Sequence, residues 1–121
     1  MTNTTPQFST GYNKGFRMTF HNGMTISVQF GSSNYCSRSN CDSYPMSEMK
    51  EYIVTSPDAE LAIWDANGNW FNFGTDEVKG FVTPDEVALW IHIVSSAERL
   101  NHLQELAEEV GLVEKLLNQK Q

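Results

Sequence analysis

The chain has 121 residues, of which 40% are hydrophobic and 12% aromatic, and its formal net charge is −7. This length and composition predict one folded domain and exclude a chain that stays disordered. The acidic charge argues against polymeric nucleic acid as a partner, because binding to its backbone requires clustered lysine and arginine. The apolar runs are far shorter than the roughly 18 residues of a membrane-spanning helix, so we expect no membrane partner.

Residues 1–15 lack a basic stretch followed by an apolar run, so we expect no secretory signal and a cytoplasmic location. Their polar composition predicts a flexible arm, with Phe8 and Tyr12 as candidate anchors. Cys36 and Cys41 are expected to be reduced in that compartment. Their C-x4-C spacing, without a second pair, is a poor zinc motif, so we expect no metal and no cofactor.

Residues 16–20 and 24–30 are short runs rich in aromatic and β-branched residues, which predict two strands. Asn22-Gly23 between them is a strong hairpin signal, because both residues can adopt positive φ. Apolar and polar residues alternate in the second run, which predicts one apolar face. Residues 31–50 then form a long polar segment without periodicity. Such loops are usually functional or disordered, so this segment is either a binding loop or a plain surface excursion.

The middle of the chain predicts three further strands, at residues 51–55, 59–65 and 70–73. Asn67-Gly68 predicts a tight turn between the last two. The acidic residues around this turn lack the spaced carboxylates and the closing glutamate of a calcium loop, so we expect no calcium there.

Thr83-Pro84-Asp85-Glu86 predicts the start of a helix, with Thr83 as N-cap, proline in the first helical position and glutamate completing a capping box. The residues that follow are apolar around most of the helix circumference, which predicts burial on more than one side. His92 lies among them, and we interpret it as a packed or interface histidine rather than a catalytic one.

Residues 97–118 predict an amphipathic helix with an acidic face, whose continuity Gly111 weakens. Ser95 and Glu98 fit a second capping box, so this helix either begins there or continues the preceding one. Its apolar stripe fits dimerisation and packing on the chain's own sheet equally well. Strands first and helices last predict an α+β fold, a small antiparallel β-sheet built from hairpins followed by two C-terminal α-helices.

The chain is thus interpreted as a single domain with a flexible arm at 1–15, mainly strands at 16–82 and helices at 83–118. The sequence contains no nucleophile elbow, phosphate-binding loop, dinucleotide fingerprint or metalloprotease motif. No acidic pair has the setting of a general acid and base. We therefore expect a binding protein rather than an enzyme.

The segments GFRMTFHNGMTISVQFGSSNYC, AELAIWDANGNWF and FVTPDEVALWI resemble small phage proteins of the first Thoeris anti-defence family. These are sponges that sequester cyclic ADP-ribose signals, and some also trap cyclic oligonucleotides of CBASS. The resemblance implies an antiparallel sheet with C-terminal helices, assembled as a homodimer or as a hexamer (a trimer of dimers). It also implies a ligand pocket between protomers, a ligand bound whole, and the cytoplasm of the host cell as the location.

The resemblance and the chemistry of the side chains together suggest a ligand site. Aromatic rings suit a nucleobase, and asparagine, arginine and backbone N–H groups suit phosphate. In the tail, Arg99 is the only basic residue before Lys115. The chosen residues are Phe30, Gly31, Asn34 and Tyr35 at the hairpin exit, Arg38 in the loop, Phe81 before the helix, and Arg99 and His102 on the tail.

Two other functions fit the same sequence. One is a protein-interaction module that inhibits a host enzyme through its acidic helical face. The other is an enzyme that degrades such a signal.

Overall fold

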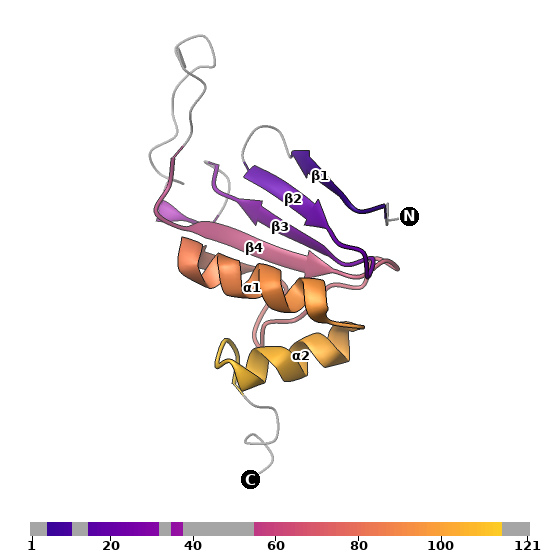
Figure 1. Ribbon diagram of the computed structural model, residues 1–121. Coiled ribbons are helices and arrows are strands. Elements are labelled where there is room, and N and C mark those ends of the chain that lie inside the picture. The colour runs from indigo at the N-terminus through magenta and orange to yellow at the C-terminus, as the bar shows by residue number, and fades with distance from the viewer. Residues whose placement is uncertain (1–4, 11–14, 32–34, 38–54, 115–121) are drawn as a thin grey trace.

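A five-stranded antiparallel sheet with strand order β1-β2-β3-β4-β5 forms one layer of the protein, and two helices follow it in the chain (Figure 1). The computed structural model describes residues 5–10, 15–31, 35–37 and 55–114. The predicted α+β fold is confirmed. The elements are β1 (Gln7–Thr10), β2 (Gly15–Thr19), β3 (Thr25–Gln29), β4 (Ala59–Trp64), β5 (Lys79–Val82), α1 (Pro84–Ser96) and α2 (Leu100–Glu109).

The β2–β3 hairpin forms as predicted, with Phe16 opposite Val28 and Met18 opposite Ile26. Side chains of a strand alternate between faces, so these apolar residues share one face of the sheet. Along β4, Leu61 and Ile63 continue the same apolar rows. α1 lies against this face beside β4, and α2 lies beyond α1, on the side away from the sheet (Figure 1). The core therefore sits between the β3–β4 half of the sheet and α1.

The turn of this hairpin uses its asparagine differently from the prediction. Gly23 has a φ of 86°, but Asn22 is not among the described residues with positive φ. The amide of Asn22 instead donates to the carbonyl oxygens of Val94 and Ala97, at 2.7 and 2.6 Å. Its Oδ1 accepts a hydrogen bond from the Met24 backbone N–H at 2.9 Å. One side chain thus ties the β2–β3 turn to the last turn of α1.

Three strand assignments change, and one of them is β5 (Lys79–Val82), which forms where no strand was predicted. Gln7–Thr10, within the predicted arm, pair with β2 as the edge strand β1, and Phe8 is 76% exposed rather than a buried anchor. The predicted strand at residues 70–73 is wrong, because the segment makes only a single bridge, between Trp64 and Trp70, and the Phe71 N–H donates to the Ile63 carbonyl at 2.8 Å without extending it into a strand. Phe71 turns inward instead and packs edge-to-face against Trp90, with 5.9 Å between ring centroids. The predicted strand at 51–55 lies outside the described residues, apart from Thr55.

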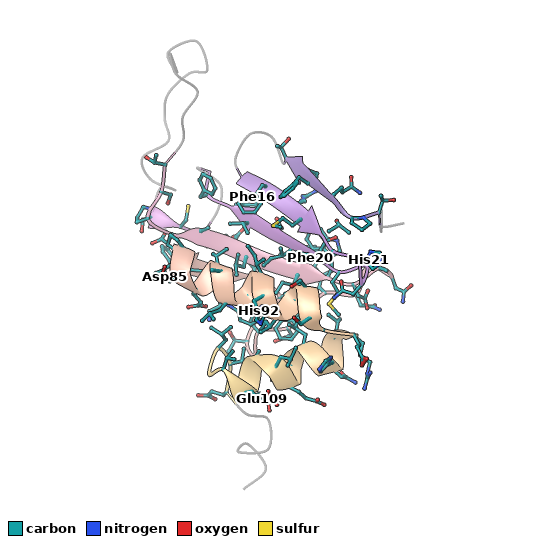
Figure 2. All side chains as sticks on the ribbon, in the orientation of Figure 1. Phe16, Phe20, His21, Asp85, His92 and Glu109 are labelled. Atoms are coloured by element: carbon teal, nitrogen blue, oxygen red, sulfur yellow. The ribbon has the colours of Figure 1, made fainter. Side chains whose placement is uncertain are left out.

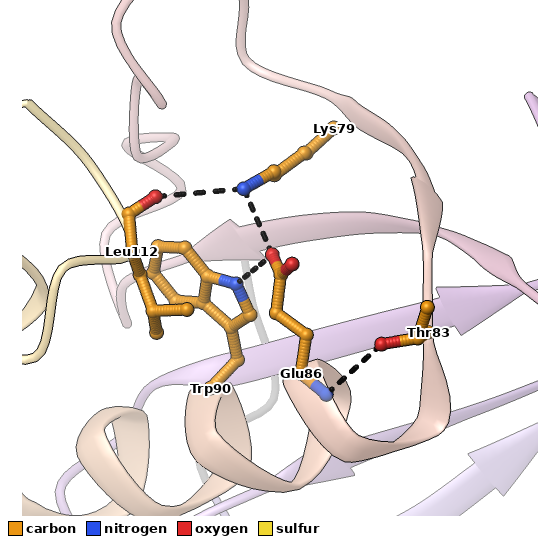
Figure 3. Close-up of polar contacts among 5 residues, drawn as sticks. All are labelled: Lys79, Thr83, Glu86, Trp90 and Leu112. Carbon is orange, nitrogen blue, oxygen red and sulfur yellow. Dashed lines mark hydrogen bonds and ion pairs between the residues drawn. The ribbon is translucent and has the colours of Figure 1, made fainter.

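α1 begins as predicted, because the Thr83 hydroxyl accepts a hydrogen bond from the Glu86 backbone N–H. The Glu86 carboxylate does not complete the capping box; it binds the Trp90 indole N–H at 3.0 Å and the Lys79 ammonium at 2.8 Å (Figure 3). Burial would raise the pKa of the Glu86 carboxyl. The hydrogen bonds from Lys79 and Trp90 and the positive charge of Lys79 outweigh that effect and hold the pKa below its usual value. Lys79 also donates to the Leu112 carbonyl, so these residues join β5, α1 and the segment after α2.

The second helix is separate and shorter than predicted. α1 ends at Ser96, and the Ser95 hydroxyl donates to a carbonyl of α1, so the second capping box is wrong. α2 ends near Gly111, which has a φ of 79°. His92 is exposed, so the interpretation of a histidine packed within this chain is also wrong. None of the described helices is long and apolar enough to cross a bilayer.

Candidate functional site

A cavity of about 380 Å³ opens between the sheet and the start of α1. Phe16 and Asp85 lie toward this end of the molecule, and Phe20 and His21 toward the other (Figure 2). A volume of this size is within the range that proteins use for small ligands. The lining residues are Phe16, Val28, Phe30, Thr55, Ser56, Asp58, Ala59, Val82, Pro84 and Val87.

The strand pattern explains the apolar part of this lining. Phe16 and Val28 face each other across β2 and β3, and Phe30 lies two residues beyond Val28 along the chain. The two-residue period of a strand places all three on the face that α1 covers. α1 covers this face only in part here, with Val87 in its first turn, and the two phenylalanine rings are left half-buried. The cavity is therefore a gap at the edge of the core and has aromatic walls.

The polar part of the lining comes from the turn before β4. The Ser56 hydroxyl donates to the Asp58 carbonyl at 2.7 Å. The Asp58 carboxylate accepts hydrogen bonds from the backbone N–H and the hydroxyl of Ser37, both at 2.6 Å. Asp58 is the one residue with a formal charge in the lining, as far as the structure describes the chain. The site thus combines apolar walls with an acidic, acceptor-rich rim.

Two of the predicted residues, Tyr35 and Phe81, are brought together beside this cavity. The Phe81 backbone N–H donates to the Tyr35 carbonyl at 2.9 Å. Both side chains are largely exposed, at 63% for Tyr35 and 60% for Phe81. Their neighbours Ala59 and Val82 line the cavity, and the Tyr35 N–H donates to the Glu60 carboxylate. We call Tyr35 and Phe81 the aromatic pair.

An irregular stretch of β5 presents Phe81. The register between β4 and β5 shifts between Ala59 and Leu61, and Phe81 has a φ of 57°, the one positive φ outside glycine among the described residues. A β-bulge of this kind re-aims a side chain, and the left-handed conformation costs a non-glycine residue about 1–2 kcal/mol. Gly80 is required there, because a Cβ on it would lie 2.7 Å from the Cβ of Tyr35.

The other predicted site residues are divided between three places. Phe30 lines the cavity, and Gly31 is buried with its carbonyl accepting from the Cys36 thiol at 3.7 Å. Arg99 and His102 lie at the opposite end of the sheet, since Asn22 of the β2–β3 turn binds the nearby Ala97.

At that opposite end, the side chains are engaged locally. Arg99 is exposed and lies 3.9 Å from the Glu98 carboxylate. His102 Nδ1 accepts a hydrogen bond from the Glu98 backbone N–H at 3.0 Å. Asn34 and Arg38 lie outside the described residues. Within one chain, therefore, the tail residues do not reach the cavity.

Sequence reasoning missed several of the lining residues, chiefly Phe16, Asp58 and Val87. The period of two in residues 24–30 predicts one apolar face, but the same pattern also marks ordinary core residues. Asp58 carries no sequence motif, and only the fold places it in the lining of the cavity. The described residues contain no cluster of three or more metal-binding side chains.

Comparison with known proteins adds no relative. No protein-family model matches the chain, and no curated protein or solved structure is significantly similar to it. The function proposed for the chain therefore rests on the cavity, the aromatic pair and the charges around them.

Proposed function

We propose that this protein binds a cyclic nucleotide signal and sequesters it without cleaving it, as a sponge that counters a nucleotide-based defence of the host cell. The ligand would be a cyclic ADP-ribose isomer or a cyclic oligonucleotide, held in the host cytoplasm. The observation that carries the proposal is the cavity, which is walled by Phe16 and Phe30 and adjoins the exposed aromatic pair. Aromatic faces bind nucleobases by stacking, and a base shielded from water makes stronger polar contacts.

The rim of the cavity favours binding over hydrolysis. Acid–base catalysis needs a titratable group aimed at the reacting atoms, and cleavage generally needs a second group to complete the reaction. Asp58 is the ionisable side chain that the described lining contains, and its carboxylate is held by two hydrogen bonds from Ser37. A group committed in this way suits recognition of the ligand.

We further propose a homodimer or a hexamer made of three dimers. α1 has 13 residues and is roughly 20 Å long, which keeps the tail residues of one chain far from its own cavity. Arg99 and His102 of a second copy could approach the same cavity, because they are carried on the outer helix layer. The mass in solution should then exceed the 13.7 kDa of one chain.

Incubation with ligand followed by heating tests the proposal. Purified protein is mixed with cyclic ADP-ribose isomers or cyclic trinucleotides, separated from free ligand and then denatured. We expect ligand of unchanged mass to be released. Ligand of altered mass would favour an enzyme that degrades the signal, and the absence of any retained ligand would refute the sponge.

A second candidate is a protein-interaction module that inhibits a host enzyme. The exposed carboxylates Glu105 and Glu109 on α2 favour it, because they form an acidic surface accessible to a basic partner. Capture of a single enzyme from host lysate, lost at high salt and on replacing both glutamates with glutamine, would support this function.

A further inference from the structure

The lining of the cavity is poorly suited to a phosphate group. A phosphate shielded from water needs cationic side chains or free backbone N–H groups as partners. The described lining residues include neither lysine nor arginine nor histidine, and the charge that they carry is the carboxylate of Asp58. A phosphate in this space would lose its hydration and meet a like charge.

Two cations among the described residues, Arg17 and Lys79, lie on strands that help to line the cavity, and both are engaged elsewhere. Arg17 follows Phe16 directly, so its side chain points to the opposite face of the sheet. There its guanidinium lies 5.4 Å from the ring centroid of Trp64. Lys79 is paired with Glu86 at 2.8 Å. Neither residue is among those that line the cavity.

The start of α1 does not replace them. A helix N-terminus often binds anions through its free N–H groups and its dipole. Here the first helical residue, Pro84, has no N–H, and the Thr83 hydroxyl occupies the N–H of Glu86. Asp85 and Glu86 add two acidic side chains to the first turn. The partial positive charge at this helix N-terminus is therefore already balanced by the protein's own acidic side chains.

An uncharged aromatic ring fits the same space well. Phe16 and Phe30 supply aromatic side chains to the lining, and Val28, Val82 and Val87 supply aliphatic ones. A carboxylate has about four acceptor positions, and Ser37 uses two of those on Asp58. The rim can therefore accept hydrogen bonds from an amino group of a base or from a ribose hydroxyl.

We infer that the cavity holds the purine nucleoside end of the bound molecule and that its phosphates stay outside. This inference rests on the proposed function and adds an orientation to it. The base lies between Phe16 and Phe30, with its donor groups toward Asp58. The phosphates face the solvent side of the cavity mouth, where a second copy of the chain could meet them.

Calorimetric titration of the full chain with three probes tests the orientation. Adenosine represents the nucleoside end, inorganic pyrophosphate represents the phosphates, and cyclic ADP-ribose is the whole ligand. We expect adenosine to bind, although more weakly than the whole ligand, and pyrophosphate to show no measurable binding. Pyrophosphate that binds and competes with adenosine would overturn the inference.

Two variants locate the binding. Val87→Phe fills the cavity and should weaken both adenosine and the whole ligand at least tenfold. Leu89→Phe, on the 45% exposed Leu89 of the same helix, is the matched control and should change neither. Circular dichroism checks that both variants fold.

Asp58→Asn gives a test that does not depend on filling the core. Asparagine keeps the shape and can still accept from the Ser37 N–H, but it removes the charge and half of the acceptors. If the nucleoside occupies the cavity, adenosine binding falls several-fold. If a phosphate lies there instead, removal of the negative charge tightens binding, and the inference is wrong.

The outcomes separate this inference from the proposed function. If the whole ligand binds equally to the wild type, Val87→Phe and Asp58→Asn, the proposed sponge function stands, but the placement of the nucleoside in the cavity is refuted. If adenosine binds but no cyclic nucleotide does, the cavity remains a nucleoside site and the proposed sponge function is refuted. Absence of binding by all three probes would refute both.

Discussion

Replacement of Asn22 by aspartate should destabilise the fold far more than an ordinary surface substitution. The Asn22 amide supplies both of its N–H donors to carbonyl oxygens near the end of α1, at 2.7 and 2.6 Å. In Asn22→Asp, a carboxylate would face those two oxygens with no proton to offer. A hydrogen bond is worth about 1 kcal/mol net, and a buried group left unsatisfied costs about 1–3 kcal/mol more. We therefore expect a loss of roughly 3–5 kcal/mol at neutral pH.

Urea unfolding followed by tryptophan fluorescence measures this loss, because Trp90 is fully buried in the native state. Asn67→Asp is the matched control. It makes the same chemical change in the other Asn-Gly turn, where Asn67 is exposed, and should cost within about 0.5 kcal/mol. Asn22→Ala should lie between the two variants, at roughly 2–4 kcal/mol.

The dependence on pH makes the test sharper. Protonation of the introduced carboxyl restores one donor, so the gap between Asn22→Asp and Asn22→Ala should narrow as the pH falls. Equal costs for Asn22→Asp and Asn67→Asp at neutral pH would show that the turn is not held to the helix, and the reasoning would fail.

Three further predictions concern the surroundings of the cavity. Phe81→Gly should stabilise the fold by up to about 1 kcal/mol in thermal unfolding, because glycine adopts the left-handed backbone without strain, and it should weaken ligand retention. Phe81→Ala is the control, because alanine keeps the strain. Equal stability of the two variants would contradict a strained bulge. Gly80→Ala should displace the Tyr35 backbone, lower ligand affinity and reduce stability, and unchanged affinity would count against the aromatic pair. The pKa of Glu86 is lowered in the folded state. Its pairing with Lys79 therefore contributes stability at pH values above the ordinary carboxyl pKa, and this stability is lost as the pH falls through the lowered pKa of the folded state. Glu86→Gln should thus be less stable than the wild type at neutral pH and equal to it in strong acid, and a constant difference in acid unfolding curves would exclude this pairing.

Local sequence signals were sufficient for much of the fold. Alternation of apolar and polar residues identified β3, and the Asn-Gly pairs located both turns. Thr83 and Pro84 located the start of α1, where capping depends on neighbours in the chain. Each of these features is decided within a few residues, so the sequence alone carries the information.

Features decided by distant residues were not predictable in the same way. β1 has one large apolar residue, Phe8, and pairs only because β2 offers it an edge. Phe71 reads as part of a strand, but the ring of Trp90 draws it into the core. The candidate site needed the fold for the same reason, since its walls come from β2, β3, β5 and α1.

The link between Asn22 and α1 also has a consequence for how the chain is made. The first of its carbonyl partners, Val94, lies 72 residues farther along the chain. At a synthesis rate of about 5–20 residues per second, the apolar face of the β2–β3 hairpin leaves the ribosome roughly 4–14 s before its cover exists. During that interval the nascent chain exposes Met18 and Ile26 beside an unpaired edge strand. Truncation before α1 should therefore yield an insoluble product, and rapid folding depends on completion of the helices.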